Sequence, residues 1–388
     1  MSAPGSSPTD ADPFAGVATP TALSQRIVEA IQASGPITFA RFMEQALYEP
    51  DLGYYRSGRP TVGREGDFLT SPEVHAVFGY AVGATAVSVW EGMGEPASFQ
   101  VVDVGPGSGA LMSDLFAYVD ARSPGLAAAI GGVMVEPSPE AAADQRRRLG
   151  GLGTRIAWRT DPLEPESVRG LIVANELLDA QPVHRLRWEP SGWRELQVDV
   201  DGTAGLHDVA GAISDAALLE PLEGRVGSEG QVVEVGLQAA AIVGELAEAL
   251  VEGMLLLFDY GYARERLYAS WRREGTLMTF RRHTPGEDPY RHVGEQDLTC
   301  HVDLDAVEAA AIRAGLTPYA RVSQAEWLAA AGALSGELPS GGAAAELETY
   351  LSRRRGSETL SDPAGLGRIQ VMAFGRGGAT VAPGLETR

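Results

Sequence analysis

Two acidic residues and a glycine-rich turn have a spacing that could bind a small charged ligand. Asp103 precedes the turn Gly105-Pro-Gly-Ser-Gly109, and a run with helical periodicity follows it. Glycines let the backbone approach a ligand closely, and the first turn of a helix offers unpaired N–H groups. Glu136 follows a second apolar run, residues 132–135, at a position where a carboxylate can bind both hydroxyls of a ribose. The pattern therefore predicts a site for a ribose-containing cofactor.

The identity of that cofactor depends on Asp103. Gly105, Gly107 and Ala110 also fit the dinucleotide fingerprint G-x-G-x-x-G/A. A pyrophosphate needs no carboxylate at position 103, whereas a ligand with an ammonium group does. The pattern resembles the first motif of S-adenosylmethionine methyltransferases, in which this loop holds the methionine end of the cofactor. The alternative is a packing turn with two solvated acids. We expect S-adenosylmethionine to be bound by Asp103, Gly105, Gly107, Gly109 and Glu136.

A second pair of carboxylates could act on the methyl acceptor. Glu176 and Asp179 follow the predicted strand at residues 170–174, and their spacing lets both face one cleft if a helical turn begins there. Methyl transfer requires a positioned nucleophile and removal of a proton. Because a guanidinium has a pKa above 12, carboxylates that hold it and draw off charge would help. We predict that Glu176 and Asp179 orient the acceptor. Alternatively, Asp179 caps its own loop and Glu176 touches only the cofactor, as Asn175 would.

Six blocks of sequence resemble the MidA-like methyltransferase family, in order between about residues 22 and 375. They are Leu52-Gly-Tyr-Tyr55, Gly66-Asp-Phe-Leu-Thr-Ser-Pro-Glu73, Asp103-Val-Gly-Pro-Gly-Ser-Gly109, Asn175-Glu-Leu-Leu-Asp-Ala-Gln-Pro-Val-His184, Asp259-Tyr-Gly261 and Asp297-Leu-Thr-Cys-His-Val-Asp303. The departures, at residues 177–178 and at Gln181, affect packing more than chemistry. Mitochondrial members of the family methylate an arginine on a respiratory complex I subunit and support assembly of the complex. The resemblance thus implies a class I methyltransferase that acts on protein arginine.

The resemblance also implies roles for two further blocks. The loop at residues 66–73 would belong to the active-site wall and close over the cofactor, which makes Asp67, Thr70, Pro72 and Glu73 candidate contacts. The same residues also read as a helix start, with Thr70 or Ser71 as N-cap, Pro72 at the first helical position and Glu73 in the first turn. His301 is a candidate substrate contact or acid/base group, or simply a satisfied buried residue. The histidines lack metal-ligand spacing, so we expect no metal site.

The order of predicted elements indicates an α/β protein with a Rossmann-like, doubly wound parallel sheet. Its strands are expected at residues 99–104, 132–135, 155–158, 170–174 and 253–258, with an antiparallel closing strand at 368–374. Helices are expected at residues 39–47, 74–90 and 303–314, and an antiparallel hairpin at residues 185–188 and 193–200. An inserted strand pair that leaves the fourth strand would shape the substrate side of the cleft.

These elements divide the chain into six expected segments. They are a disordered tail (1–20), an N-terminal helical region with the active-site loop (21–98), the first part of the Rossmann-like core (99–184), an inserted β-hairpin/helical substrate subdomain (185–235), the second part of the core (236–376) and a flexible tail (377–388).

Composition excludes several classes of function. The chain of 388 residues has 31 Lys+Arg against 52 Asp+Glu, a net charge of −21 that disfavours non-specific binding to nucleic acid or anionic membranes. No apolar run approaches the roughly 20 residues of a membrane span. A single cysteine, Cys300, is typical of a reducing cytoplasm, and the use of arginine for every cation suggests a GC-rich bacterial genome.

The leading interpretation is a cytoplasmic S-adenosylmethionine-dependent methyltransferase with a protein arginine as acceptor. A small-molecule O or N acceptor is the nearest alternative, and a homodimer is possible. A non-catalytic assembly or chaperone factor would be expected to have lost Asp103, the glycines or Glu136, and all are present. A nicotinamide dehydrogenase would need neither Asp103 nor the block at Asn175-Glu176.

Overall fold

The structure is a computed structural model that describes residues 20–58, 66–67, 69–201, 205–332, 344–377 and 385, with only the backbone described at 344–349. The expected N-terminal tail at 1–20 lies outside the described residues except for Pro20. Most of the expected tail at 377–388, and residues 59–65 and 68 of the active-site loop, also lie outside them.

A seven-stranded sheet forms the centre of the molecule, in the order β16-β17-β10-β5-β2-β3-β4. Five neighbouring strands are parallel: β2 (Phe99–Val104), β3 (Ile130–Val135), β4 (Ile156–Arg159), β5 (Val168–Asn175) and β10 (Leu250–Asp259). Two antiparallel strands complete the edge, β17 (Gln370–Arg376) beside β10 and β16 (Thr317–Ser323) beside β17. The predicted Rossmann-like sheet and its antiparallel closing strand are confirmed.

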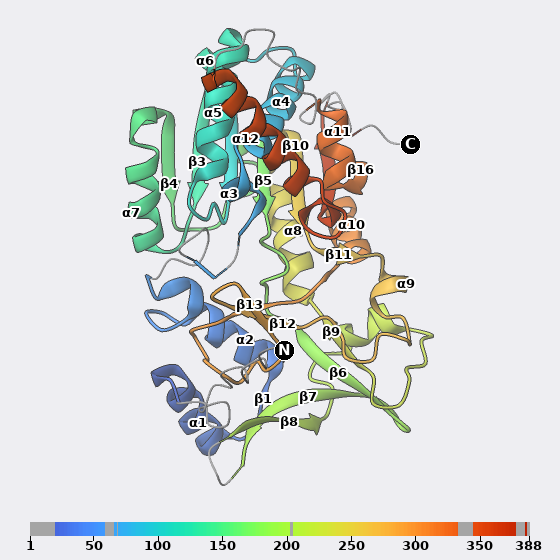
Figure 1. Cartoon of the computed structure of the whole chain (residues 1–388). Coiled ribbons are helices and arrows are strands. Elements are labelled where there is room, and N and C mark those ends of the chain that lie inside the picture. Colours follow the sequence, from blue (N-terminus) through green and yellow to red (C-terminus); the bar gives the residue numbers. More distant parts are fainter. Residues whose placement is uncertain are drawn as a thin grey trace, which may run out of the picture.

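Helices cover both faces of this sheet, so the parallel strands can be apolar on both sides. One face packs against α4 (Val77–Gly92), α5 (Ala110–Arg122), α6 (Pro124–Ala129), α11 (Gln324–Ala330) and α12 (Ala344–Leu360). The other face packs against α8 (Leu237–Ala249) and α10 (Leu304–Arg313). Beyond β4 lies α7 (Pro139–Arg148), at the end of the sheet opposite β16 (Figure 1). Successive residues of β2 point to opposite faces of the sheet, so Val101 is buried under the first layer of helices and Val102 under the second.

The helix expected at residues 74–90 is interrupted, which corrects the prediction. A short helix, α3 (Ser71–Val74), ends at His75, whose backbone is extended with φ −165° and ψ 145°. The His75 Nδ1 accepts a hydrogen bond from the N–H of Val77, where α4 begins. This cap replaces the backbone pairing that a continuous helix would make. As a result α3 is a separate turn that can lie against the cofactor loop.

A second sheet lies apart from the central one, in the lower part of Figure 1. It contains β1 (Ile37–Thr38), β6 (His184–Glu189), β7 (Gly192–Val200), β8 (Leu206–Gly211) and β9 (Val232–Val235). The predicted hairpin is confirmed, because β6 and β7 pair antiparallel with Trp188 opposite Trp193. We call this sheet the second lobe, together with α1 (Ala22–Ser34), α2 (Phe39–Tyr48), the 3-10 turn η1 (Tyr54–Arg56) and the strands β12 (Met278–Arg281), β13 (Thr284–Gly286) and β14 (Asp297–Thr299).

The second lobe combines stretches that are distant in sequence. Its core joins α1 and α2 to Val198 of β7 and to Val293, Leu298 and Cys300 near β14. Residues 276–300 therefore pack with the N-terminal helices, although the sequence suggests that they belong to the Rossmann-like core. The sequence pattern does not predict this contact, because the elements that it joins are more than 200 residues apart. The expected domain boundaries remain a prediction.

Several short elements complete the fold. In the central part, η2 (Gly150–Arg155) precedes β4 and η4 (Leu366–Arg368) precedes β17, whereas η3 (Ala216–Leu222) stands between β8 and β9 of the second lobe. After β10 come the strand β11 (Gly261–Tyr262), which pairs with β15 (Val302–Asp303), and the helix α9 (Arg264–Leu267). In the part of the chain that the structure describes, no helix combines the length and the apolar character needed to cross a membrane.

Candidate active site

A cavity of about 820 Å³ opens at the carboxyl ends of β2, β3 and β5. The strand order reverses between β2 and β5, which is where open α/β sheets bind their ligands. Nine of the residues predicted from the sequence line this cavity: Thr70, Pro72, Glu73, Asp103, Gly105, Gly107, Glu136, Asn175 and Glu176. Four predicted residues are not among those that line it: Asp67, Gly109, Asp179 and His301.

The glycine turn takes backbone conformations that other residues adopt rarely. Gly105, Gly107 and Gly109 have φ angles of 68°, 53° and 82°. A Cβ on Gly105 would lie 3.0 Å from the Cδ1 of Leu177, so glycine also keeps the turn close to the end of β5. Gly109 is the left-handed N-cap of α5 and packs under Leu149 instead of facing the cavity. Its contribution is therefore to the shape of the turn.

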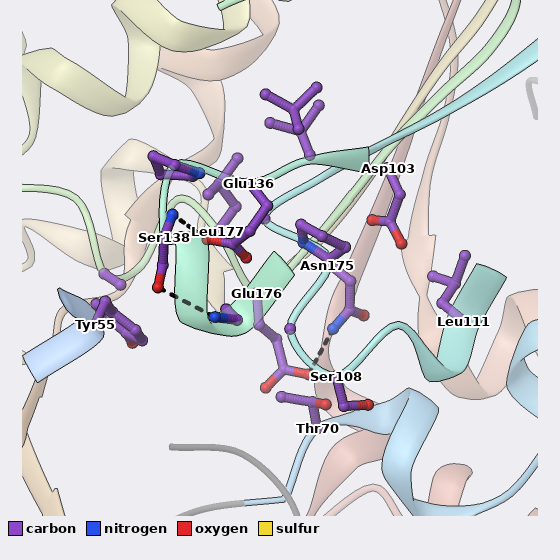
Figure 2. A pocket seen from close by; sticks show the side chains of 18 of the residues that line it. Tyr55, Thr70, Asp103, Ser108, Leu111, Glu136, Ser138, Asn175, Glu176 and Leu177 are labelled. Atoms are coloured by element: carbon purple, nitrogen blue, oxygen red, sulfur yellow. Dashed lines mark hydrogen bonds between the residues drawn. The ribbon is translucent and has the colours of Figure 1, made fainter. Parts of the chain in front are cut away.

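Asp103 is a buried carboxyl group that faces the cavity with one oxygen lacking a partner. It is 2% exposed, and no described residue hydrogen-bonds its Oδ2. Burial, and secondarily the nearby Glu136, raises the pKa of Asp103 to about 7. Figure 2 shows Asp103, Glu136 and Glu176 around the same space. A cationic ligand group in this space would satisfy the free oxygen and favour the ionised carboxylate.

Glu136 is held in place by its own loop and by α7. Its carboxylate accepts hydrogen bonds from the Ser138 N–H at 2.8 Å and from Gln145 Nε2 at 3.0 Å. Gln145 also donates to the carbonyl of Gly107 at 2.9 Å, so one side chain links the acid to the glycine turn. Burial raises the pKa of Glu136, while these hydrogen bonds oppose the shift. Gln145 was not predicted, since a glutamine in a polar helix carries no distinguishing signal.

Glu176 has an unusual backbone conformation. Its φ is 51°, in the left-handed region, directly after β5. The conformation is fixed because its N–H donates to the Phe258 carbonyl at 2.8 Å. The Glu176 Oε1 accepts from Asn175 Nδ2 at 3.0 Å and from the Ser71 N–H at 3.3 Å. Such strain is concentrated at functional sites. Burial raises the pKa of Glu176 to about 7.

Three further buried carboxyl groups surround Glu176. Asp259 accepts from the N–H groups of Leu178 at 2.7 Å and Tyr260 at 2.9 Å, and burial raises its pKa to about 8. Burial, with Asp259, Glu176 and Asp297 nearby, also raises the pKa of Asp179, whose side chain is 8% exposed. Asp297 accepts from the Tyr55 hydroxyl at 2.8 Å, and burial raises its pKa to about 7. Among the described residues, none of the four acids forms an ion pair.

Two tyrosines that sequence reasoning missed also line the cavity. Tyr48 and Tyr55 come from α2 and η1 of the second lobe and stack at a centroid distance of 5.6 Å. The Tyr48 hydroxyl donates to the carbonyl of Ala180 at 3.0 Å, next to Asp179. Tyr55 lies within a recognised block, but nothing in the block alone indicates that its ring faces a ligand. The second lobe thus contributes directly to the cavity wall.

Two predicted site residues, Asp67 and His301, are not among those that line the cavity, and their roles remain predictions. Asp67 accepts hydrogen bonds from the Tyr54 hydroxyl at 2.9 Å and from the Arg282 N–H at 2.6 Å, so it fastens the active-site loop to the second lobe. His301 stacks on the ring of Tyr260 at 6.3 Å and meets the ring of Tyr262 edge-on at 5.0 Å. Burial, followed by Arg368 and Arg272, lowers the pKa of His301 to about 4. The His301 imidazole is therefore neutral at pH 7, and its role as a substrate contact or acid/base group remains a prediction.

Comparison with known proteins identifies the family. Residues 81–322 match a family described as "Putative S-adenosyl-L-methionine-dependent methyltransferase". The chain is 30% identical to the mitochondrial protein arginine methyltransferase NDUFAF7 homolog of Drosophila melanogaster, over 91% of this chain and 84% of that protein. The chain belongs to the MidA-like methyltransferase family. The Xenopus tropicalis protein arginine methyltransferase NDUFAF7 is also 30% identical, over 73% of this chain and 69% of that relative.

A solved structure gives the same assignment. A Burkholderia thailandensis protein bound to S-adenosyl-homocysteine superposes with a TM-score of 0.85 at 30% identity, covering 94% of each chain. This MidA-like protein is therefore an S-adenosylmethionine-dependent methyltransferase. Its cavity fits that cofactor, because an unpartnered Asp103 oxygen can meet an ammonium and the fixed Glu136 carboxylate can meet ribose hydroxyls. Among the described residues, no group of three or more His, Cys, Asp or Glu could hold a metal ion.

The pKa of Asp103 leads to a prediction about pH. In the free protein this carboxyl is about half protonated near pH 7, whereas an adjacent ammonium group requires it ionised. Binding must then release a proton below pH 7, so the affinity for S-adenosylhomocysteine falls as the pH falls. We expect about tenfold tighter binding at pH 8 than at pH 6 in calorimetric titrations. Adenosine, which lacks the ammonium group, serves as the control, and an equal pH dependence for both ligands would contradict the assignment.

Proposed function

We propose that this methyltransferase transfers a methyl group to the guanidinium of an arginine residue in a protein, with Glu176 in contact with the acceptor. The observation that carries the proposal is a group of four buried carboxyl groups, Glu176 and the three around it, none of which pairs with a cationic side chain of the described residues. Buried charges are normally paired, so a cationic acceptor would supply the missing partner. The names of the relatives from Drosophila and Xenopus support the same acceptor.

The cofactor and the acceptor would be held by different acids. S-adenosylmethionine supplies an already activated methyl group. Asp103 would bind its ammonium, Glu136 its ribose hydroxyls, and the N–H groups of the turn Gly105–Gly109 would lie along it. Thr70 and Pro72 of the active-site loop complete this part of the wall. Asn175 orients Glu176 through the 3.0 Å hydrogen bond between their side chains.

Glu176 would position the guanidinium and accept its proton. A carboxylate in contact with a guanidinium forms a strong, charge-assisted hydrogen bond, which fixes the attacking nitrogen. That nitrogen gains the methyl group and loses one proton, which Glu176 would accept. With a pKa of about 7, Glu176 is ionised in half of the molecules at neutral pH, which suits general base catalysis. Asp179, Asp259 and Asp297 lie behind Glu176, and a cationic acceptor in the cavity would favour their ionised forms.

The experiment that tests this function starts without a known acceptor. The purified protein is incubated with methyl-tritiated S-adenosylmethionine and a cell extract from its own organism in which the gene has been deleted. We expect label in a protein band, recovered as methylarginine after acid hydrolysis. Omission of the enzyme is the control. Label only in the small-molecule fraction, or on a residue other than arginine, would contradict the proposal and point to the alternative acceptor class.

A further inference from the structure

One cationic side chain lines the cavity within the described residues, and it is Arg148. The acidic residues of the same wall are Glu73, Asp103, Glu136, Glu140, Asp144, Glu176 and Glu245. S-adenosylmethionine carries two positive groups, the ammonium and the sulfonium, and one negative group, the carboxylate of its methionine part. The acidic wall suits the positive groups. The carboxylate needs a donor, and among the described residues of the wall Arg148 is the one with the opposite charge.

Arg148 reaches the glycine turn from the last turn of α7. Its Nη1 lies 2.5 Å from the Ser108 Oγ and 3.3 Å from the Glu73 Oε1. Ser108 in turn donates to the same Glu73 oxygen. A guanidinium has five N–H donors in a planar fork, and Arg148 uses only Nη1 in the contacts with described residues. Its side chain is 43% exposed, so the other donors are accessible to a ligand.

The backbone that carries Arg148 is held firmly against the turn. Gln145, one helical turn earlier, bonds both the Gly107 carbonyl and Glu136. Leu149, the next residue, is 2% exposed and lies under Gly109. These contacts fix the end of α7 relative to the glycine turn. The guanidinium therefore lies at the rim of the cavity, beside Ser108 of the glycine turn.

We propose that Arg148 binds the carboxylate of the methionine part of the cofactor. The planar fork of arginine matches a carboxylate, and a charge-assisted pair at this position complements the ammonium site at Asp103. Arg148 thereby selects ligands that carry both groups over other nucleosides. The inference concerns the cofactor and is independent of which acceptor the enzyme methylates.

A purely structural role for Arg148 makes a different prediction. Its contacts with Glu73 and Ser108 also hold α3 against the glycine turn, a role that we call the clamp. Loss of the clamp would weaken the binding of every nucleoside ligand to the same extent. The two roles separate when ligands that differ only in the carboxylate are compared. Decarboxylated S-adenosylhomocysteine keeps the adenosine, the thioether and the ammonium but lacks the carboxylate.

The test is calorimetric titration of the full chain with S-adenosylhomocysteine and with its decarboxylated analogue. For Arg148→Gln we expect about tenfold weaker binding of S-adenosylhomocysteine, the scale of one partly exposed charged hydrogen bond, and less than a twofold change for the analogue. Arg148→Lys keeps the charge but not the fork and should lie between. Arg147→Gln is the matched control, because the neighbouring Arg147 pairs with Asp144 and does not line the cavity.

Three results would overturn the proposal. Equal losses for the two ligands would assign Arg148 to the clamp. Unchanged affinity of Arg148→Gln for S-adenosylhomocysteine would show that Arg148 does not contact the ligand. An equal loss of affinity in Arg147→Gln would show that the effect comes from the net charge of the protein and not from a contact of Arg148. If Arg148→Gln does not fold, as judged by its thermal unfolding, the same comparison of ligands is made with Arg148→Lys, and equal affinities of wild type and that variant for both ligands would likewise reject a fork-specific contact.

Discussion

Glu176→Gln is expected to lower the rate of methyl transfer by at least about 100-fold, the usual scale for a positioned acid or base. The amide keeps the shape of the side chain and can retain the hydrogen bond with Asn175, so the left-handed backbone at this position should persist. It cannot accept a proton, and it attracts a guanidinium only weakly. The measurement is tritium transfer to the acceptor protein at saturating S-adenosylmethionine.

The affinity for S-adenosylhomocysteine should change less than threefold in the same variant, because the predicted cofactor contacts at Asp103 and Glu136 are untouched. Glu245→Gln is the matched control, since Glu245 lines the same cavity from α8 and has no proposed role. Normal turnover in Glu176→Gln would remove this residue from the mechanism. A large loss of cofactor affinity would instead assign Glu176 to the cofactor alone.

Asp103→Asn is expected to weaken binding of S-adenosylhomocysteine by about 100-fold. The variant replaces the predicted acceptor of the ligand ammonium with a neutral amide of the same size, and one of its two polar atoms is a donor. The pH dependence of binding between pH 6 and 8 should disappear together with the affinity. Both quantities come from one series of calorimetric titrations.

Asp114→Asn provides the control for this experiment. Burial raises the pKa of Asp114 to about 6, but its side chain is not among those that line the cavity. It should bind S-adenosylhomocysteine like the wild type. Should Asp103→Asn keep full affinity and the same pH profile, the ammonium is bound elsewhere and the first motif serves only the fold.

Local patterns predicted several of the residues that line the cavity at the ends of the parallel strands. Asp103 lies near the end of β2, the glycine turn follows that strand, and Glu136 follows β3 of the same βαβ unit, so chain order alone brings them to the same edge of the sheet. Glu176 follows from the same rule, because β5 lies next to β2. The Rossmann-like order of strands was predicted for the same reason. The edge strand β16 was not predicted, since its residues are mostly half-buried and include Pro318.

The acceptor side could not be predicted in the same way. Asp297 meets Tyr55 across 242 residues, and no spacing within either segment signals that contact. Asp179 was expected to face the cavity beside Glu176. The left-handed conformation of Glu176 ends the strand without a helical turn, and Asp179 lies behind it. Arg148 belongs to a run of three arginines, and only the packing of Gln145 and Leu149 shows which of them faces the turn.

The composition of the second lobe has a consequence for how the chain is made in the cell. The apolar faces of α1 and α2 leave the ribosome early, whereas Val293, Leu298 and Cys300, which cover them, are synthesised more than 200 residues later. Until then the N-terminal helices have no complete core, and contacts this distant in sequence form slowly. We therefore expect chains that stop before residue 300 to aggregate through these helices. The proposed acceptor side of the site is completed by Asp297, which is synthesised well after the strands β2 to β5 that carry the predicted cofactor contacts.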